Sequence, residues 1–203
     1  MDQGWAAREA AEIGRRIAQR RTALHMSAQQ LAERCAEFGM PEITRPVLVK
    51  LEHGRREAVS TAELAVLAAA LDTAPILLLY PVGQAGSAEY LPGKTAAPWD
   101  AARWWADEAF LGPDGTISPV YRRSAGSLFR DHQQLLSELP ADVTRADYLA
   151  VSAGQHGGAK APRERMLALT ARALRDIRLG IREMGLEPPE LPPELKWLGE
   201  LED

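Results

Sequence analysis

The sequence contains a single cysteine, Cys35, among 203 residues, and its four histidines are scattered along the chain. One thiol cannot form an internal disulfide, and no Cys/His cluster has the spacing of a zinc site. We therefore expect no metal and no cofactor. We also expect Cys35 to be a small, buried apolar residue.

Long apolar runs and enzyme motifs are absent as well. No run approaches the roughly 18 residues that a membrane-spanning helix needs, and residues 1–10 are too polar for a signal peptide. The expected compartment is therefore the reducing cytoplasm. The sequence has no Walker loop, dinucleotide-binding glycine pattern, metalloprotease helix or nucleophile elbow. We therefore expect that the protein is not an enzyme.

An overall basic excess is also lacking, because the formal net charge is −4. The distribution of charge is more informative than its sum. Residues 1–81 hold ten Lys/Arg against ten Asp/Glu, and the remainder of the chain carries the whole negative balance. Between Arg45 and Arg56, however, four positive residues accompany only Glu52. Any surface for a polyanion is therefore expected in the amino-terminal part.

Two helix patterns with clear end signals surround this basic stretch. Ser27 precedes strong helix formers and Gln30 lies three residues on, which predicts a capping box at the start of a helix that ends near Gly39. A second helix is expected over residues 44–53, with Thr44 as its capping residue and Pro46 in its first turn. Gly54 ends this helix, and two arginines follow.

These residues resemble the helix-turn-helix of the phage-repressor-like regulators, the Cro/CI or XRE family. The similarity lies in SAQQLAERC for the first helix and ITRPVLVKLEHGRR for the second, although their connection is about six residues longer than the family's turn. In that family the second helix enters the major groove of DNA. The resemblance implies a double-stranded DNA partner. It implies base contacts from Arg45, Pro46, Val49 and Lys50, and phosphate contacts from Ser27, Gln29, Thr44, His53, Arg55 and Arg56.

The chemistry of these side chains suits such a role. Arg45 and Lys50 can donate to guanine edges, and Val49 can contact a thymine methyl group. The resemblance also implies an ion pair between Arg21 and Glu52 that ties the first helix, expected over residues 8–26, to the second helix of the motif. Loss of one partner from such a pair costs about 3–5 kcal/mol, so Glu52→Ala is expected to impair folding.

The overall fold is expected to be all-α. Residues 1–81 would form a helix-turn-helix domain of four or five helices, with another helix from Thr61 to Asp72 and a short helix or extended piece over 75–81. A linker over 82–98, in which 88–91 could form a strand, would lead to a mainly helical region over 99–203. In that region helices are expected over 100–110, 119–139, 145–153 and 162–185.

Two features of the second half leave alternatives open. Trp99, Trp104 and Trp105 would form either the core of a small second domain, which we favour, or a ligand cage or partner surface. The long helix over 162–185 would either pack within its own chain or pair with a second copy through Leu167, Thr170, Leu174, Ile177, Ile181 and Met184. The Pro-rich tail over 187–203 is expected to lay Trp197 and Leu198 on a surface.

Taken together, the sequence predicts a sequence-specific, double-stranded DNA-binding transcriptional regulator, most simply a homodimer. Its carboxy-terminal region would dimerise or bind a protein or small-molecule effector. The alternative is a protein-interaction adaptor or antitoxin-like protein that keeps the helix-turn-helix as a scaffold. The acidic balance of the second half favours this alternative, because negative charge repels DNA.

Overall fold

A computed structural model describes residues 4–84, 86–112, 114–118, 124–139, 149 and 161–201. The chain is mostly helical, with 60% helix and 7% strand. Two small antiparallel sheets are present as well, so the expectation of an all-α fold is correct only in the predominance of helix. The chain divides into two compact units, Met1–Val120 and Tyr121–Asp203. No helix among the described residues is long and apolar enough to cross a membrane.

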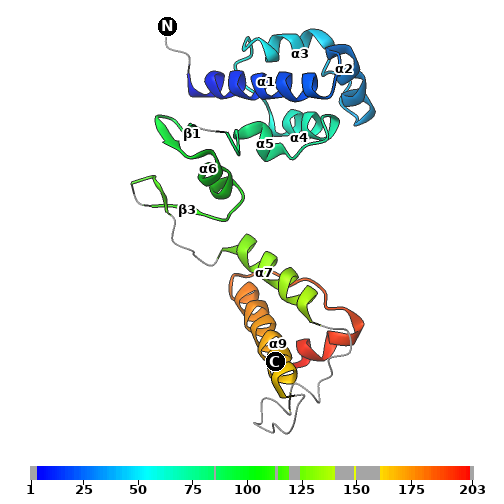
Figure 1. The fold of residues 1–203 in the computed structure, drawn as a ribbon, viewed down its shortest axis with the longest axis vertical. Coiled ribbons are helices and arrows are strands. Elements are labelled where there is room, and N and C mark those ends of the chain that lie inside the picture. The colour runs from blue at the N-terminus through cyan, green and yellow to red at the C-terminus, as the bar shows by residue number, and fades with distance from the viewer. Residues whose placement is uncertain are drawn as a thin grey trace. The chain divides into compact units, whose positions relative to one another are not determined.

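The first unit begins with five helices. They are α1 (Trp5–Ala23), α2 (Ala28–Glu37), α3 (Arg45–Glu52), α4 (Thr61–Ala70) and α5 (Pro75–Leu79). Helix α1 lies between α3 and the α4–α5 pair (Figure 1), and it packs on both α3 and α5. The segment after α4, for which a short helix or an extended piece was expected, is thus a helix.

Serine side chains start two of these helices. Ser27 and Gln30 form the predicted capping box of α2, since the Ser27 hydroxyl accepts from the Gln30 backbone N–H and the Gln30 side chain accepts from that of Ser27. Helix α4 begins in the same way, but its cap is Ser60 and not the predicted Thr61. Glu63 explains the difference, because it lies three residues after Ser60 and completes the box there.

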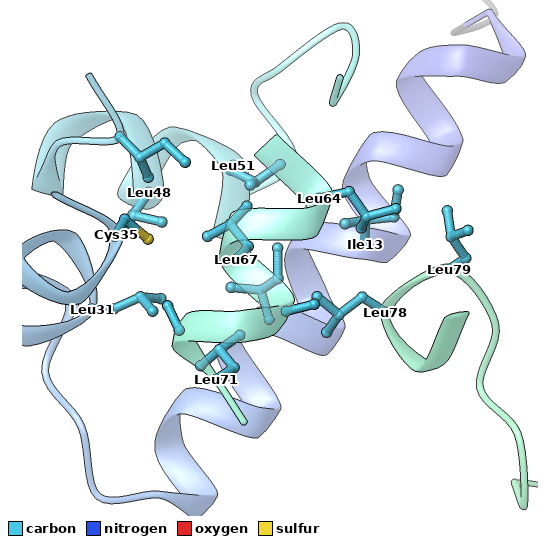
Figure 2. Close-up of a cluster of buried hydrophobic side chains, with 14 of the residues drawn as sticks. Ile13, Leu31, Cys35, Leu48, Leu51, Leu64, Leu67, Leu71, Leu78 and Leu79 are labelled. Atoms are coloured by element: carbon cyan, nitrogen blue, oxygen red, sulfur yellow. The ribbon is translucent and has the colours of Figure 1, made fainter. Parts of the chain in front are cut away.

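The apolar sides of these helices meet in one core, which Figure 2 shows in close-up. Leu31 and Cys35 of α2, Leu48 and Leu51 of α3 and Leu67 of α4 are all buried there. Each fully buried leucine contributes about 1.5–3 kcal/mol relative to an exposed one. Cys35 is therefore a core residue as predicted, and burial raises the pKa of its thiol to about 11, which keeps it protonated and unreactive at neutral pH.

Two arginines of α1 bind the carboxyl ends of other helices. Arg16 is buried and donates to the carbonyl oxygens of Leu78 and Leu79, both at 2.7 Å. Arg20 donates to those of Leu71 and Asp72, at 3.1 and 2.8 Å. The last carbonyls of a helix have no partner within it and carry partial negative charge. These arginines are therefore structural ties between α1 and the ends of α4 and α5.

The first unit continues beyond the predicted boundary at residue 81. Strands β1 (Ala88–Leu91) and β2 (Lys94–Ala96) form an antiparallel hairpin, so the strand expected over 88–91 is confirmed. Tyr90 enters the core of the first unit, and Glu89 binds Arg8 of α1 at 2.8 Å. The segment over 82–98 is thus packed on the helical domain, whereas a linker was expected there.

Helix α6 (Pro98–Trp105) ends five residues before the predicted Phe110. Ala97 is its N-cap, and Asp107 adopts a φ of +60°, which turns the chain away from the helical path. The short strands β3 (Phe110–Leu111) and β4 (Ile117–Ser118) then form a second hairpin around the expected turn at Gly112–Gly115. Trp104 packs against the first core, whereas Trp99 and Trp105 are exposed, so these tryptophans do not form the core of a second domain.

The second unit contains α7 (Ala125–Glu138), α9 (Ala161–Glu183) and the 3₁₀ helix η1 (Pro193–Leu201). The helix expected over 145–153 falls largely outside the described residues. Leu174 of α9 packs with Leu139 and with three leucines of the tail, Leu191, Leu195 and Leu198. Ile177 and Ile181 of α9 pack with Leu128 of α7. Leu174, Ile177 and Ile181 of the expected stripe therefore pack within their own unit, whereas Met184 is 44% exposed. The tail covers Leu174 through a buried Leu198 and a partly buried Trp197.

Candidate functional site

Helix α3 has well-defined ends. Thr44 is its N-cap residue, although its hydroxyl makes no capping hydrogen bond, and Pro46 occupies the first turn. At the other end the N–H of Gly54 donates to the carbonyl of Leu51 at 2.9 Å, and that of Arg55 donates to the carbonyl of Lys50 at 2.8 Å. This pair of bonds is a Schellman motif. It requires the positive φ of Gly54, +64°, and it places Arg55 directly beyond the helix.

The inner side of α3 is pressed against α1. Leu48 and Leu51 are buried in the core. A Cβ atom built on Gly14 of α1 would lie only 2.1 Å from the carbonyl oxygen of Leu51. The two backbones therefore approach closely because position 14 has no side chain. The orientation of α3 is set by this contact, which leaves its other side facing outward.

An ion pair fixes the same two helices at the carboxyl end of α3. The Arg21 Nε and Nη2 atoms donate to the two oxygens of the Glu52 carboxylate at 2.7 and 2.8 Å. The side chains of Arg21 and Glu52 are only 18% and 8% exposed. Arg21 also donates to the carbonyl of Met26 at 2.7 Å, so one guanidinium joins α1, α3 and the segment before α2. The structure thus contains the ion pair that the resemblance implied.

The residues expected to contact bases lie on the outer side of α3. Arg45, Pro46 and Lys50 are exposed, and Val49 is half-buried. Neither Arg45 nor Lys50 forms a side-chain hydrogen bond or ion pair with any residue that the structure describes. Their charged groups are consequently available to a partner.

The residues expected to contact phosphate fall into two groups. The side chains of Thr44 and Arg55 are exposed and have no hydrogen-bonding partner within the described part of the chain. Ser27 is occupied by its capping box, and the amide of Gln29 donates to Glu33 at 2.9 Å. These α2 side chains therefore already have internal partners.

His53 is exposed, but its ring is oriented by a contact with its own helix. Its Nδ1 atom lies 2.7 Å from the carbonyl oxygen of Val49 and must donate to it. In the neutral ring the remaining nitrogen, Nε2, is then an acceptor. Only the protonated ring can donate to a phosphate.

Arg56 also has an internal partner. Its guanidinium forms an ion pair with the Glu63 carboxylate at the start of α4. Burial by itself would raise the pKa of Glu63, but hydrogen bonds from Arg56 and Ser60 outweigh it and lower that pKa. Arg56 is thus held by the capping box of α4, and Arg55 is the better placed of the two for an external anion.

A hollow of about 330 Å³ lies between α2 and the beginning of α3. Its polar lining residues are Gln29, Glu33, Thr44 and Arg45. Glu33 was not among the site residues predicted from the sequence, although its spacing of four residues from Gln29 places both on one face of α2. No group of three or more His, Cys, Asp or Glu within the described ranges could hold a metal ion.

No family model, curated protein or solved structure matches this chain. Three cations lie on and just after α3: Arg45 and Lys50 in the helix, and Arg55 in the turn beyond it. We call these three residues the α3 cation group.

Proposed function

We propose that the protein binds double-stranded DNA sequence-specifically, with the outer side of α3 in the major groove, and acts as a transcriptional regulator. The observation that carries this proposal is how the cations of the first unit are distributed. From residue 4 to residue 81, six arginines bind carboxylates or helix carbonyls: Arg8, Arg15, Arg16, Arg20, Arg21 and Arg56. The remaining cations, Arg34 and the α3 cation group, have no such partner within the described chain.

Three of these four cations lie on one short helix and its following turn, and the fourth, Arg34, lies on α2. An α-helix with its side chains is about 10–12 Å across, and the major groove of B-DNA, about 12 Å wide, admits it. Arg45 stands at the beginning of α3, Lys50 in its last turn and Arg55 just beyond it. Side chains in these places can reach base edges from the helix and phosphate from the turn. The expected roles are base contact for Arg45 and Lys50, and phosphate contact for Arg55.

Two alanine variants separate these roles. Lys50→Ala should lower the affinity for the preferred duplex by about 1–3 kcal/mol and relax the base preference at one position. Arg55→Ala should weaken binding to all duplexes equally and reduce the slope of log K against log salt by about one. Selection from a randomised duplex pool, followed by fluorescence anisotropy at several salt concentrations, measures both effects.

Arg15→Ala is the matched control. Arg15 is a cation on α1 with a half-exposed side chain, and it binds Glu12 at 2.7 Å. Its loss should leave both affinity and salt slope unchanged. If Lys50→Ala instead weakens every sequence by the same factor, Lys50 contacts phosphate and the proposed groove contact is wrong.

A second candidate function is that of a protein-interaction adaptor or antitoxin-like partner. It is favoured by Trp99 and Trp105 of α6, which are 57% and 50% exposed, because exposed tryptophans are enriched at the centres of protein interfaces. In that case the randomised pool would yield no enriched sequence and the wild-type protein would retard little DNA. Homodimerisation remains a prediction, and three residues of the expected stripe of α9, Leu174, Ile177 and Ile181, are packed within their own unit.

A further inference from the structure

A carboxylate lies beside the expected base-reading residues. Glu33 of α2 and Arg45 of α3 line the same hollow, and both are exposed. They form no ion pair with each other, and Arg45 has no other partner in the described part of the chain. An anionic acceptor and a cationic donor thus line one hollow, each with free hydrogen-bonding capacity.

The hydrogen bond within α2 determines what this site can offer. The Gln29 Nε2 atom donates to Glu33 Oε1 at 2.9 Å. That bond orients both side chains and leaves the Gln29 carbonyl oxygen and the Glu33 Oε2 atom as acceptors. The α2 side of the hollow therefore presents acceptors, whereas the α3 side presents the guanidinium donors of Arg45.

A carboxylate side chain can increase the affinity for a DNA duplex in only one way. Phosphates repel it whatever the sequence, so it can gain only from hydrogen-bond donors on base edges. In the major groove these are the amino groups of cytosine N4 and adenine N6. Adenine also exposes the N7 acceptor next to N6, which repels the second carboxylate oxygen, whereas cytosine has no acceptor on that edge. A carboxylate therefore favours cytosine.

We propose that Glu33 is a specificity-determining residue, which accepts a hydrogen bond from cytosine N4 next to the guanine bound by Arg45. This inference rests on the proposed DNA-binding function and adds a base identity to it. Gln29 is then a positioning residue that holds the carboxylate and not a phosphate contact. Glu33 weakens binding to all DNA through repulsion and recovers affinity only where cytosine is present.

The variant Glu33→Gln tests this proposal, with Glu37→Gln as its matched control. Both residues are exposed on α2, but Glu37 does not line the hollow, and glutamine keeps the shape of glutamate while removing its charge. The wild type should prefer cytosine at one position by about 5- to 100-fold. Glu33→Gln should show a smaller cytosine preference, because its uncharged amide oxygen is a weaker acceptor and the amide also matches adenine N6 and N7. It should bind unselected duplex more tightly than the wild type. Glu37→Gln should keep the preference.

A change in the DNA provides a second, independent measurement. The cytosine is replaced by a 2-pyrimidinone analogue that lacks the 4-amino group, and anisotropy gives the affinity of wild type and Glu33→Gln for both duplexes. The analogue should weaken the wild type by a larger factor than the variant, whose amide oxygen is an uncharged and weaker acceptor, so that the double-mutant cycle shows coupling. An equal loss of affinity in both proteins, or an unchanged cytosine preference in Glu33→Gln, would overturn only the role proposed for Glu33. A wild type that binds no duplex would overturn the proposed function itself.

Discussion

At the scale of single residues, arginine has two distinct uses in the first unit. Arg16 and Arg20 bind helix carbonyls, and Arg21 binds Glu52. Arg45 and Arg55 make no such bonds within the described residues. A count of charges in the sequence treats all five alike. Their partners are set by how α1 packs on the neighbouring helices, so only the structure reveals that Arg45 and Arg55 are left without internal partners.

Glu52→Ala tests the structural use of arginine. The change leaves the guanidinium of Arg21 with a single carbonyl partner in a mostly buried position. We expect the free energy of unfolding to fall by about 3 kcal/mol, as measured by urea denaturation followed by circular dichroism.

Glu57→Ala is the control for this variant, because Glu57 is exposed and has no ion pair within the described part of the chain. It should change the unfolding free energy by less than about 0.5 kcal/mol. Equal, small losses in the two variants would mean that the Arg21–Glu52 pair contributes little to stability.

Local residue chemistry predicted several features correctly. The spacing of Ser27 and Gln30 identified the start of α2, and Gly54 identified the end of α3. The start of α4 was misplaced by one residue, because Ser60 and Thr61 are both capping residues and only the spacing to Glu63 distinguishes them. The internal partner of Arg56 could not be foreseen, since it depends on rotamers that the fold selects, whereas that of Gln29 is signalled by its spacing of four residues from Glu33.

At the scale of elements, the apolar stripe of α9 shows what periodicity can and cannot predict. The repeat of Leu174, Ile177 and Ile181 correctly indicated a buried side of the helix. It did not indicate which element covers that side, because α7, the tail or a second copy of α9 would require the same pattern. In the structure α7 and η1 cover it.

Leu174→Ala distinguishes packing within the chain from pairing between chains. Leu174 is fully buried, so its truncation should destabilise the second unit by about 2–5 kcal/mol. The melting temperatures of the variant and of the wild type should then depend on protein concentration to the same degree. A melting temperature that rises with concentration in the wild type but not in Leu174→Ala would instead indicate that this stripe joins two copies.

The short strands were the elements least accessible to sequence analysis. Strand β1 was anticipated, but β3 and β4 have only two residues each, too few for an alternating pattern. The turn residues between them were recognised, whereas the pairing of strands on either side was not. Helix α6 was predicted too long because the left-handed conformation of Asp107 leaves no clear mark in the sequence.

At the scale of the whole molecule, the first unit combines the proposed reading helix with an extension over residues 82–118. Tyr90, Ala101 and Ala102 of this extension are buried in the same core as α1 to α5. The extension also carries more Asp/Glu than Lys/Arg, so the sum of charge over the first unit conceals the α3 cation group. The proposed DNA binding by an overall acidic chain would thus depend on where the unpaired cations lie.

The central claim is that α3 and the turn after it form the DNA-contacting surface. Mapping of backbone amide shifts by NMR on the full chain, during titration with the duplex selected from the randomised pool, tests it most directly. The largest shifts should fall on residues 44–56, with small changes at the exposed tryptophans of α6. Largest shifts around Trp99 and Trp105, or no shifts at any duplex concentration, would contradict the account.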